Sequence, residues 1–376
     1  MIRSALKVLA AAAGAFALAA GTPGLAASAA PSAQVTAIPA DAEIIFASSM
    51  AGTKDPWGFP ARELYVSRAD GSHLTQITHA GFSHNHFGVS PDRRWIFTNR
   101  YSRGDTTGDG KIDYRDFKEL WLIDLKTLTE RRVVEGVDGG YGGVAWSPDS
   151  KFVYFSIRQG QGSNIQRWPI AGGKMVSITD NVNTLLHMPG DVHWVSDIDA
   201  SPDGKWLGML YSNGNREDPK NPRKVRIIIY KLDGTEARFV TDGGPMPAGQ
   251  YGMWPAGDFD PAFSADGKSI SFQRATTARM LKRGASTSDM MRQNLDGTGL
   301  TLLSPKNNQN QAGISSYGGP HCQVVWSVWM DDEPSHIEIA NPDGSDRKEV
   351  RFKGEVSHVQ WIPPNPPGAC KPVPAH

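Results

Sequence analysis

What this chain of 376 residues lacks already narrows its function. It contains only two cysteines and no Gly-x-Ser-x-Gly motif, the turn that carries the nucleophile of α/β-hydrolases. We therefore do not expect a serine hydrolase. Its 39 Lys and Arg balance its 39 Asp and Glu, and a chain without a basic excess is not expected to bind nucleic acid.

The N-terminal apolar run is too short to cross a bilayer. It covers Val8–Ala20, follows the cations Arg3 and Lys7, and precedes a small-x-small cleavage sequence at residues 27–29. This pattern predicts a signal peptide over residues 1–29 and a linker over residues 30–40. Removing the signal peptide leaves 37 Lys and Arg against 39 Asp and Glu. We expect a periplasmic or secreted protein with no membrane span, and a monomer.

The two cysteines leave two states open. In an exported protein, Cys322 and Cys370 could form a disulfide that ties the C-terminal tail, residues 364–376, to the preceding structure. The alternative is a pair of free thiols.

What the sequence does contain is a repeated unit: an apolar strand, a Ser-Pro-Asp turn and a second apolar strand. The first copy covers residues 84–100. Related copies are found at 144–150, 198–204, 261–267, 324–327 and 359–363. Aligned positions in successive copies are separated by 35 to 63 residues. Repeats of about 40–50 residues with short strands between turns are typical of propeller blades.

A second turn recurs between these copies and predicts hairpins. Asp-Gly turns are found at 69–72, 232–235, 295–298 and 341–345, and less typical turns fill the equivalent places at 125–127 and 171–174. The strand at 43–47 has no inner strand before it, and the strand at 356–361 has no partner after it. We therefore predict an all-β, six-bladed β-propeller over residues 41–363, closed by pairing of the N- and C-terminal strands.

The repeat resembles that of TolB-type propellers. The resemblance rests on the aromatic-Ser-Pro-Asp-Gly element and on the Asp-Gly-Ser-His-Leu-Thr-Gln-Ile-Thr segment at residues 70–78, and it covers residues 42–363. It implies the propeller fold. TolB also carries an α/β domain before its propeller, for which this chain has no room, so a role in the Tol–Pal envelope system is not expected.

The long connections are predicted to share one rim of the propeller. They cover residues 48–62, 101–118, 181–195, 212–224, 242–258, 274–289 and 305–320. Loops on a rigid scaffold commonly carry binding sites. Aromatic side chains in these loops could stack on a sugar or a peptide, or could cover the cores of the loops themselves. They are Trp57, Phe59, Tyr251, Trp254 and Tyr317.

One of these loops resembles the calcium loop of EF-hands and dockerins. Residues 105–116 place oxygen ligands at the first, third, fifth, seventh and twelfth positions, with Gly110 at the sharp turn. The predicted Ca²⁺ ligands are Asp105, Thr107, Asp109, the carbonyl of Lys111 and Asp116. The alternative is a polar loop without a metal.

Polar residues recur near the start of each predicted innermost strand. Because side chains two residues apart share a strand face, we expect seven of them to meet at the channel mouth: His84, His86, Asp258, Asp260, His321, Gln323 and His358. They could satisfy buried water and backbone groups. Alternatively, the four histidines could be catalytic or hold a second divalent metal, with Asp258, Asp260 and Gln323 binding a ligand.

The His84-Asn85-His86 segment before a Ser-Pro-Asp turn is similar to an element of oligogalacturonate lyases. That resemblance implies a metal that neutralises a uronate carboxylate, followed by β-elimination. The family's upstream Gln falls on Gly81 here. The sequence thus favours a calcium-stabilised binding module for a protein or glycan ligand on its long-loop face. The alternative is a metal-dependent polysaccharide lyase with a His and Asp cluster at the channel mouth.

Overall fold

The computed structural model describes residues 37–55, 58–84, 86–101, 105, 108–110, 118–134, 139–213, 224–244, 256–282, 286–305 and 311–363. These residues belong to one compact unit, residues 35–376. They form strands and turns, with one short helix, α1 (Val182–Leu185). In this part of the chain, no helix has the length and apolar character needed to span a membrane.

Four sheets contain four antiparallel strands each, and a fifth contains eight. The first has the order β24 (Val356–Trp361), β1 (Ile44–Ser48), β2 (Glu63–Ser67), β3 (Thr75–Gln76). The second is β4 (Phe87–Val89), β5 (Trp95–Tyr101), β6 (Lys118–Asp124), β7 (Glu130–Val134). The third is β8 (Gly139–Trp146), β9 (Phe152–Gln159), β10 (Gly162–Pro169), β11 (Val176–Ser177).

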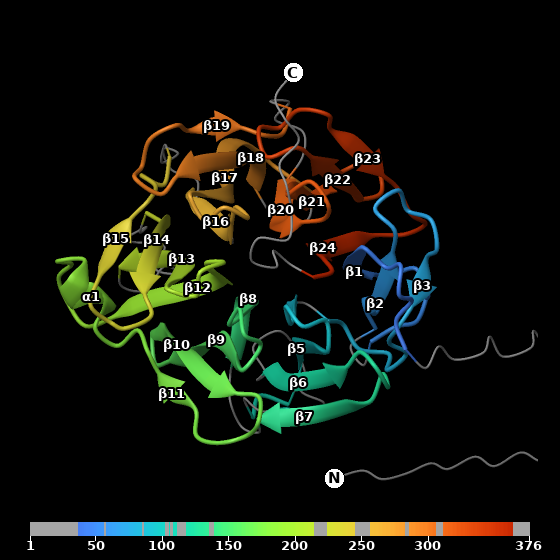
Figure 1. Ribbon diagram of the computed structural model, residues 1–376, viewed down its shortest axis with the longest axis horizontal. Helices are drawn as coiled ribbons and strands as arrows, with labels where there is room; N and C mark the ends of the chain where they lie inside the picture. Colours follow the sequence, from blue (N-terminus) through green and yellow to red (C-terminus); the bar gives the residue numbers. More distant parts are fainter. Residues whose placement is uncertain are drawn as a thin grey trace, which may run out of the picture. The chain divides into compact units, whose positions relative to one another are not determined.

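The fourth sheet is β12 (His193–Ala200), β13 (Trp206–Asn213), β14 (Arg226–Lys231), β15 (Ala237–Phe239). The eight-stranded sheet begins with β16 (Asp258–Phe263), β17 (Ser269–Met280), β18 (Ser286–Asn294) and β19 (Thr301–Leu302). It continues with β20 (Gln311–Gly318), β21 (Gln323–Trp329), β22 (His336–Ala340) and β23 (Lys348–Val350). Figure 1 shows the sheets arranged around a common centre.

The prediction of an all-β, propeller-like fold is confirmed, whereas the strands of the described residues form five sheets and do not by themselves show the predicted six blades. A single parallel bridge, Ser288 to Gln311, joins β18 to β20 and merges two groups of four strands into one sheet. It forms because β17 and β18 extend past the ends of their neighbours, with pairs as far as Met280–Ser286. The predicted pairing of the chain ends is present: β24 lies antiparallel to β1, with Ile44 opposite Trp361.

The last long repeat was assigned to the wrong strand. Residues 324–327 lie in β21, which pairs with β20 on one side and β22 on the other, so β20 is the inner strand. No Ser-Pro-Asp turn follows β20, and its turn runs through Gly319 and Pro320 instead. Tyr317, expected in a loop, therefore lies in β20 and is only 1% exposed. Cys322, in the same turn, is disulfide-bonded, and Cys370 lies outside the described residues.

The repeated Ser-Pro-Asp turn is stabilised by its own hydrogen bonds. The Ser201 hydroxyl donates to Asp203 Oδ1 at 2.7 Å and accepts the backbone N–H of Trp206 at 2.9 Å. The same contacts recur at Ser90, Ser147 and Ser264. In the Asp-Gly turns, the aspartate carboxylate accepts the Ser or Thr two residues later, as in Asp233 with Thr235.

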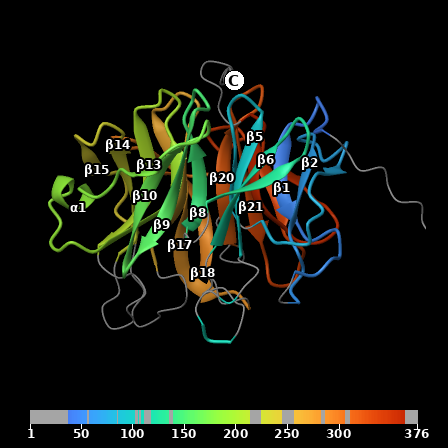
Figure 2. The ribbon, with the colours of Figure 1, turned by 90° about the horizontal axis from the view of Figure 1, so that it is seen from below.

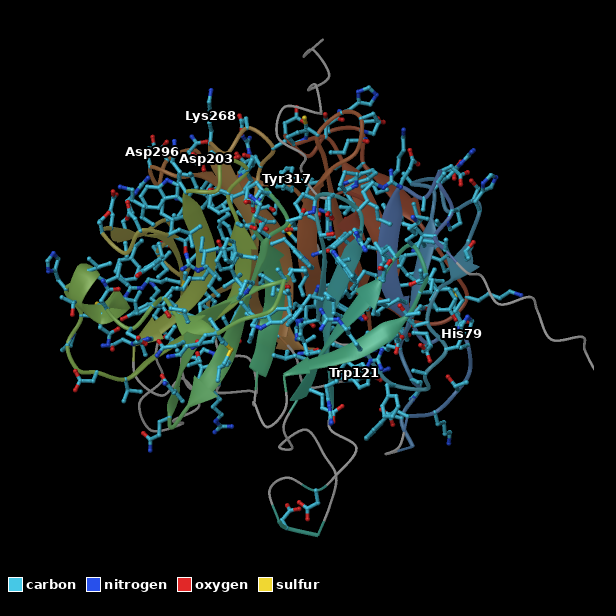
Figure 3. All side chains as sticks on the ribbon, turned by 60° about the horizontal axis from the view of Figure 1, so that its bottom comes forward. His79, Trp121, Asp203, Lys268, Asp296 and Tyr317 are labelled. Atoms are coloured by element: carbon cyan, nitrogen blue, oxygen red, sulfur yellow. The ribbon has the colours of Figure 1, made fainter. Side chains whose placement is uncertain are left out.

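These turns lie along one edge of the described structure. Figure 2 shows the strands running between two opposite rims. Figure 3 places the turn residues Asp203, Lys268 and Asp296 along one edge, with Trp121 and His79 toward the other. Apolar side chains fill the space between sheets; for example, Phe46 and Val359 of the first sheet pack with Ile337 of β22. This packing holds the inner strands around the centre.

Candidate functional site

One pocket lies among the inner strands. Its lining comes from β4, β8, β12, β16, β20 and β24, the first strand of each four-strand group, and from the residues that follow them. The repeat therefore brings equivalent positions together around one space, as the sequence alignment predicted for its well-formed copies.

A β-bulge shapes the strands that line this pocket. Pairing shifts register in β8, β12, β16, β20 and β24 against their neighbours. Four of these shifts contain a residue with positive φ: Gly143 at 110°, Asp197 at 49°, Asp260 at 53° and His358 at 49°. Non-glycine residues rarely adopt this conformation, and bulges commonly redirect a side chain. The bulge residues line the pocket.

Among the described lining residues, the charged ones are acidic: Asp197, Asp199 and Asp260. Asp199 accepts the backbone N–H of Phe263 at 2.7 Å, and burial raises the pKa of its carboxyl to about 7. Asp260 accepts the amide of Gln273 at 2.5 Å. Asp260 and His358, two of the predicted site residues, both line this pocket, and Asp199 is an additional acidic lining residue that the sequence prediction did not include.

Two of the four candidate histidines come together. The rings of His86 and His358 lie 5.3 Å apart, edge to face. The Nε2 atom of His358 is 3.2 Å from the carbonyl oxygen of Phe87. This pair lies beside the pocket, because His358 lines it and β4 begins immediately after His86.

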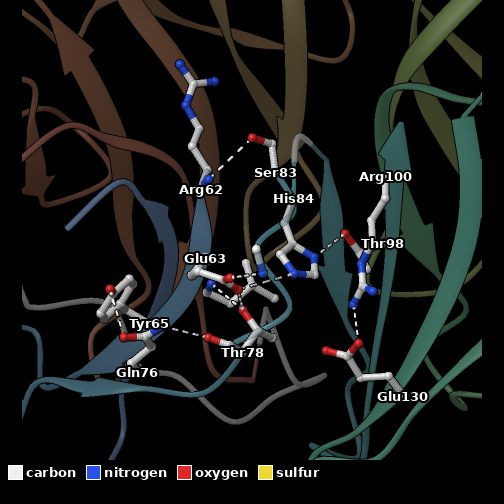
Figure 4. Close-up of polar contacts among 12 residues, drawn as sticks. Arg62, Glu63, Tyr65, Gln76, Thr78, Ser83, His84, Thr98, Arg100 and Glu130 are labelled. Atoms are coloured by element: carbon white, nitrogen blue, oxygen red, sulfur yellow. Dashed lines mark hydrogen bonds and ion pairs between the residues drawn. The ribbon is translucent and has the colours of Figure 1, made fainter. Parts of the chain in front are cut away.

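His84 does not face the pocket, so its predicted place at the channel mouth is wrong. β4 begins only at Phe87, and the two-residue alternation of a strand does not extend back to His84. Its Nδ1 lies 3.3 Å from Thr98 Oγ1, and its Nε2 lies 4.0 Å from Glu63 Oε2 (Figure 4). Burial, with a smaller effect of Arg100, holds the pKa of His84 well below its usual value.

Glu63 closes this buried contact between the first and second sheets. Its carboxylate accepts the Thr78 hydroxyl at 2.5 Å and the Gly81 backbone N–H at 2.6 Å. Nearby, Arg100 is paired with Glu130 at 2.6 Å (Figure 4). The sequence-predicted catalytic histidine therefore belongs to a packing contact.

Three further predicted site residues lie elsewhere. Asp258 is fully buried and accepts two hydrogen bonds from its cross-strand partner Arg274, at 2.7 and 2.9 Å. Burial raises the pKa of Asp258, and Arg274 opposes this rise. His321 is exposed in the β20–β21 turn, and Gln323 begins β21, where its carbonyl accepts the Trp361 indole. His321 and Gln323 were misplaced because β21 was taken for an inner strand.

The calcium prediction falls partly outside the described residues. Asp105 and Asp109 are exposed, and the Asp105 carboxylate accepts the backbone N–H groups of Gly108 at 2.6 Å and Gly110 at 2.8 Å. Gly108 and Gly110 have φ of 75° and 80°, as a tight loop requires.

Six predicted site residues lie outside the described part of the chain. Three are calcium ligands and three are loop aromatics: Thr107, Lys111, Asp116, Trp57, Tyr251 and Trp254.

A group with metal-ligand chemistry lies away from the pocket. Within the described part of the chain, one set of three His, Cys, Asp or Glu residues has ligand atoms within 4.8 Å of one another: His336, Glu338 and Glu349. The predicted second metal at the channel mouth is not represented among such groups. The sequence reasoning missed this set, although the alternation of His336 and Glu338 on one strand was a usable signal.

Comparison with known proteins identifies the fold. TolB from Acinetobacter baumannii aligns with a TM-score of 0.59 and 18% identity, covering 86% of this chain and 68% of that one. A candidate TolB from Agrobacterium tumefaciens gives 0.54 and 14%, covering 85% and 98%. Neither a protein-family model nor a curated protein sequence matches this chain.

An oligogalacturonate lyase in complex with manganese aligns with a TM-score of 0.44 and 14% identity, covering 83% of this chain and 74% of that one. At this TM-score, the alignment supports no inference about the location of a site in this chain. The TolB structures, at identities below one fifth, show the fold alone. This chain therefore shares the propeller fold of TolB.

Proposed function

We propose that this chain is an exported, six-bladed propeller that binds a protein ligand at its central pocket and is stabilised by calcium in the 105–116 loop. The count of six blades is supported by two features: one bridge alone joins β16–β19 to β20–β23, and the pocket is lined by six inner strands. Export is supported by the signal-peptide pattern of residues 1–29.

The acidic lining of the pocket is the observation that favours this function. Its described acidic residues are Asp197, Asp199 and Asp260, of which Asp199 is only partly ionised near pH 7 because burial raises its pKa to about 7. A concave surface lined by one sign of charge concentrates ligands of the opposite sign, and does so more strongly where water is partly excluded. A Lys or Arg side chain of a protein ligand has the required charge. Neutral glycans would gain less, and uronate chains would be repelled.

Binding is favoured over the alternative lyase function by the placement of the histidines. A β-eliminating site needs a base and a group that neutralises the uronate carboxylate at one place. His84 lies between two sheets, and His321 lies in an exposed turn. His86 and His358 alone meet beside the pocket, and the charged lining next to them is acidic.

The test is a binding panel with the mature protein. Oligo-lysine and oligo-arginine peptides, neutral glycans and polyuronates are titrated separately by calorimetry. We expect measurable binding of the basic peptides, weakened by Asp260→Asn and unchanged by Glu236→Gln, an equivalent change at an exposed turn residue. Failure of all basic peptides, or release of unsaturated products from polyuronates, would overturn the proposal.

Calcium is tested by thermal melts with and without chelator. An ion that binds the folded state at a hundred times its Kd adds about 2.7 kcal/mol of stability. We expect the Tm to rise with millimolar calcium and Asp105→Asn to abolish the rise. An unchanged Tm in the parent protein would exclude the calcium site.

A further inference from the structure

The strand pair β22–β23 presents a histidine and two carboxylates to one space. His336 and Glu338 are two residues apart on β22, so their side chains share one face. Glu349 of β23 is the cross-strand partner of Glu338. One ligand atom from each residue lies within 4.8 Å of the other two. Local strand geometry alone therefore brings the three together.

Two of the three side chains are buried without full hydrogen bonding. His336 is 3% exposed and Glu338 is 2% exposed. Among the described residues, neither ring nitrogen of His336 has a hydrogen-bond partner, and neither has Glu338 Oε2. His336 Nε2 points toward the cluster, 3.7 Å from Glu338 Oε1. Buried polar atoms are nearly always satisfied, and an exception indicates a bound water or ion.

A second orphaned donor lies on the same face. Trp326 of β21 is the cross-strand partner of Glu338, and its indole N–H has no partner among the described residues. An indole N–H donates only and does not bind a cation, but it can donate to a water held on the ion. The atoms that can bind an ion directly are an imidazole nitrogen of His336 and Oε2 of Glu338.

Two arginines contact the cluster without filling it. Arg347 binds Glu338 Oε1 at 2.6 Å, and Arg351 binds Glu349 Oε2 at 3.0 and 3.2 Å. The unpartnered Oε2 of Glu338 is left for a ligand. Glu349 is nearly half exposed, so an ion could reach the cluster from solvent. The two guanidinium groups oppose a cation and should keep its affinity modest.

We propose that His336, Glu338 and Glu349 form a binding site for a divalent transition metal of the zinc class. Imidazole and carboxylate are ligands that zinc accepts, whereas calcium prefers oxygen ligands alone. Three protein ligands leave a fourth position for water. A bound ion would tie β23, which is three residues long, to β22 and would satisfy the buried imidazole. This site is separate from the central pocket and from the calcium loop.

The site is tested on metal-free mature protein by calorimetric titration with Zn²⁺. Substitution of a residue that only holds a metal ligand in place typically weakens metal binding about 10–100-fold, so loss of a direct ligand should weaken binding by at least about tenfold. We expect this loss in both His336→Gln and Glu349→Gln. Glu349 is exposed, so the second variant tests the site even if the first does not fold.

The matched control is His73→Gln. His73 is an exposed histidine 2.6 Å from the carboxylate of Asp41, and this variant should bind Zn²⁺ like the parent. Anomalous diffraction at the zinc edge should place the ion between His336 and Glu349. The proposal is overturned if the parent binds no Zn²⁺, or if both ligand variants bind it as tightly as the control.

Discussion

Contacts that support the sheets and the central pocket both contain acidic side chains, but they surround them differently. Within the eight-stranded sheet, Asp258 accepts two hydrogen bonds from its cross-strand neighbour Arg274. In the first sheet, Glu63 accepts a hydroxyl and a backbone N–H. In the pocket, Asp199 accepts backbone N–H groups from Phe263 and Ala200, and the described lining contributes further acids. Burial of a carboxylate therefore does not mark function by itself. The partner shows whether the group supports packing or faces a ligand.

The strongest test of this contrast removes the partner of a buried carboxylate within a sheet. Arg274→Ala leaves Asp258, which is fully buried, without its cation. Breaking a buried pair in this way costs about 3–5 kcal/mol, and we expect that loss in the free energy of unfolding measured with urea. Adding Asp258→Asn should recover part of it. A loss under about 1 kcal/mol would mean that this pair contributes no more than a surface ion pair. Buried carboxylates in the sheets and in the pocket would then not differ in how much they depend on a partner.

The second test concerns the pocket and depends on pH. Burial raises the pKa of Asp199 to about 7 from 3.8, so the folded protein retains a proton that the unfolded chain releases. Stability should fall as pH rises between these values and stay low above about 7. Asp199→Asn cannot ionise, and we expect it to be more stable than the parent at pH 8 by about 2–4 kcal/mol.

The matched measurement is the same comparison at pH 4, where the advantage of Asp199→Asn should largely vanish. Equal stability differences at the two pH values would mean that Asp199 is ionised in the folded protein and that the pocket is better solvated than its burial implies.

The third test returns to the sheet contacts. Burial holds the pKa of His84 well below 6.5, so the unfolded chain takes up a proton in acid that the folded protein refuses. Stability should be lost progressively as pH falls below 6.5. His84→Gln should lower stability at neutral pH and reduce the loss of stability between pH 6.5 and lower pH. If the parent and the variant lose stability equally in acid, the loss arises from other groups, such as His193, whose pKa burial also lowers.

The smallest expected effect is at Asp260. Its side chain lines the pocket and is held by Gln273, and Asp260→Asn keeps an acceptor oxygen there. We expect stability to change by less than about 0.5 kcal/mol while binding of basic peptides weakens. A large loss of stability with unchanged peptide binding would show that Asp260 supports the fold and does not contact the ligand.

The sequence predicted those features that short-range chemistry determines. Ser201 and Asp203 complete their turn within a few residues, so the motif alone identifies the fold. The sequence does not reveal an inner strand where the motif is absent. β20 is followed by Gly319 and Pro320 instead of Ser-Pro-Asp, so the repeat points to β21 as the inner strand. The prediction for His84 is wrong because strand alternation begins only at β4.

The cluster on β22 and β23 needed information that a repeat does not contain. Glu349 meets Glu338 through the register of one hairpin, and a shift of one residue would turn its side chain to the other face. Likewise, the positive φ of Asp197 and Asp260 depends on bulges that sequence alternation does not reveal.

The pairing of β24 with β1 has a consequence for synthesis. Ile44 pairs with Trp361, so in a growing chain the edge of β1 that faces β24 stays unpaired until residue 361 has been made. Such an edge is a template for pairing with another chain. We therefore expect chains truncated before Val356 to need chaperone protection during synthesis and to be removed rapidly.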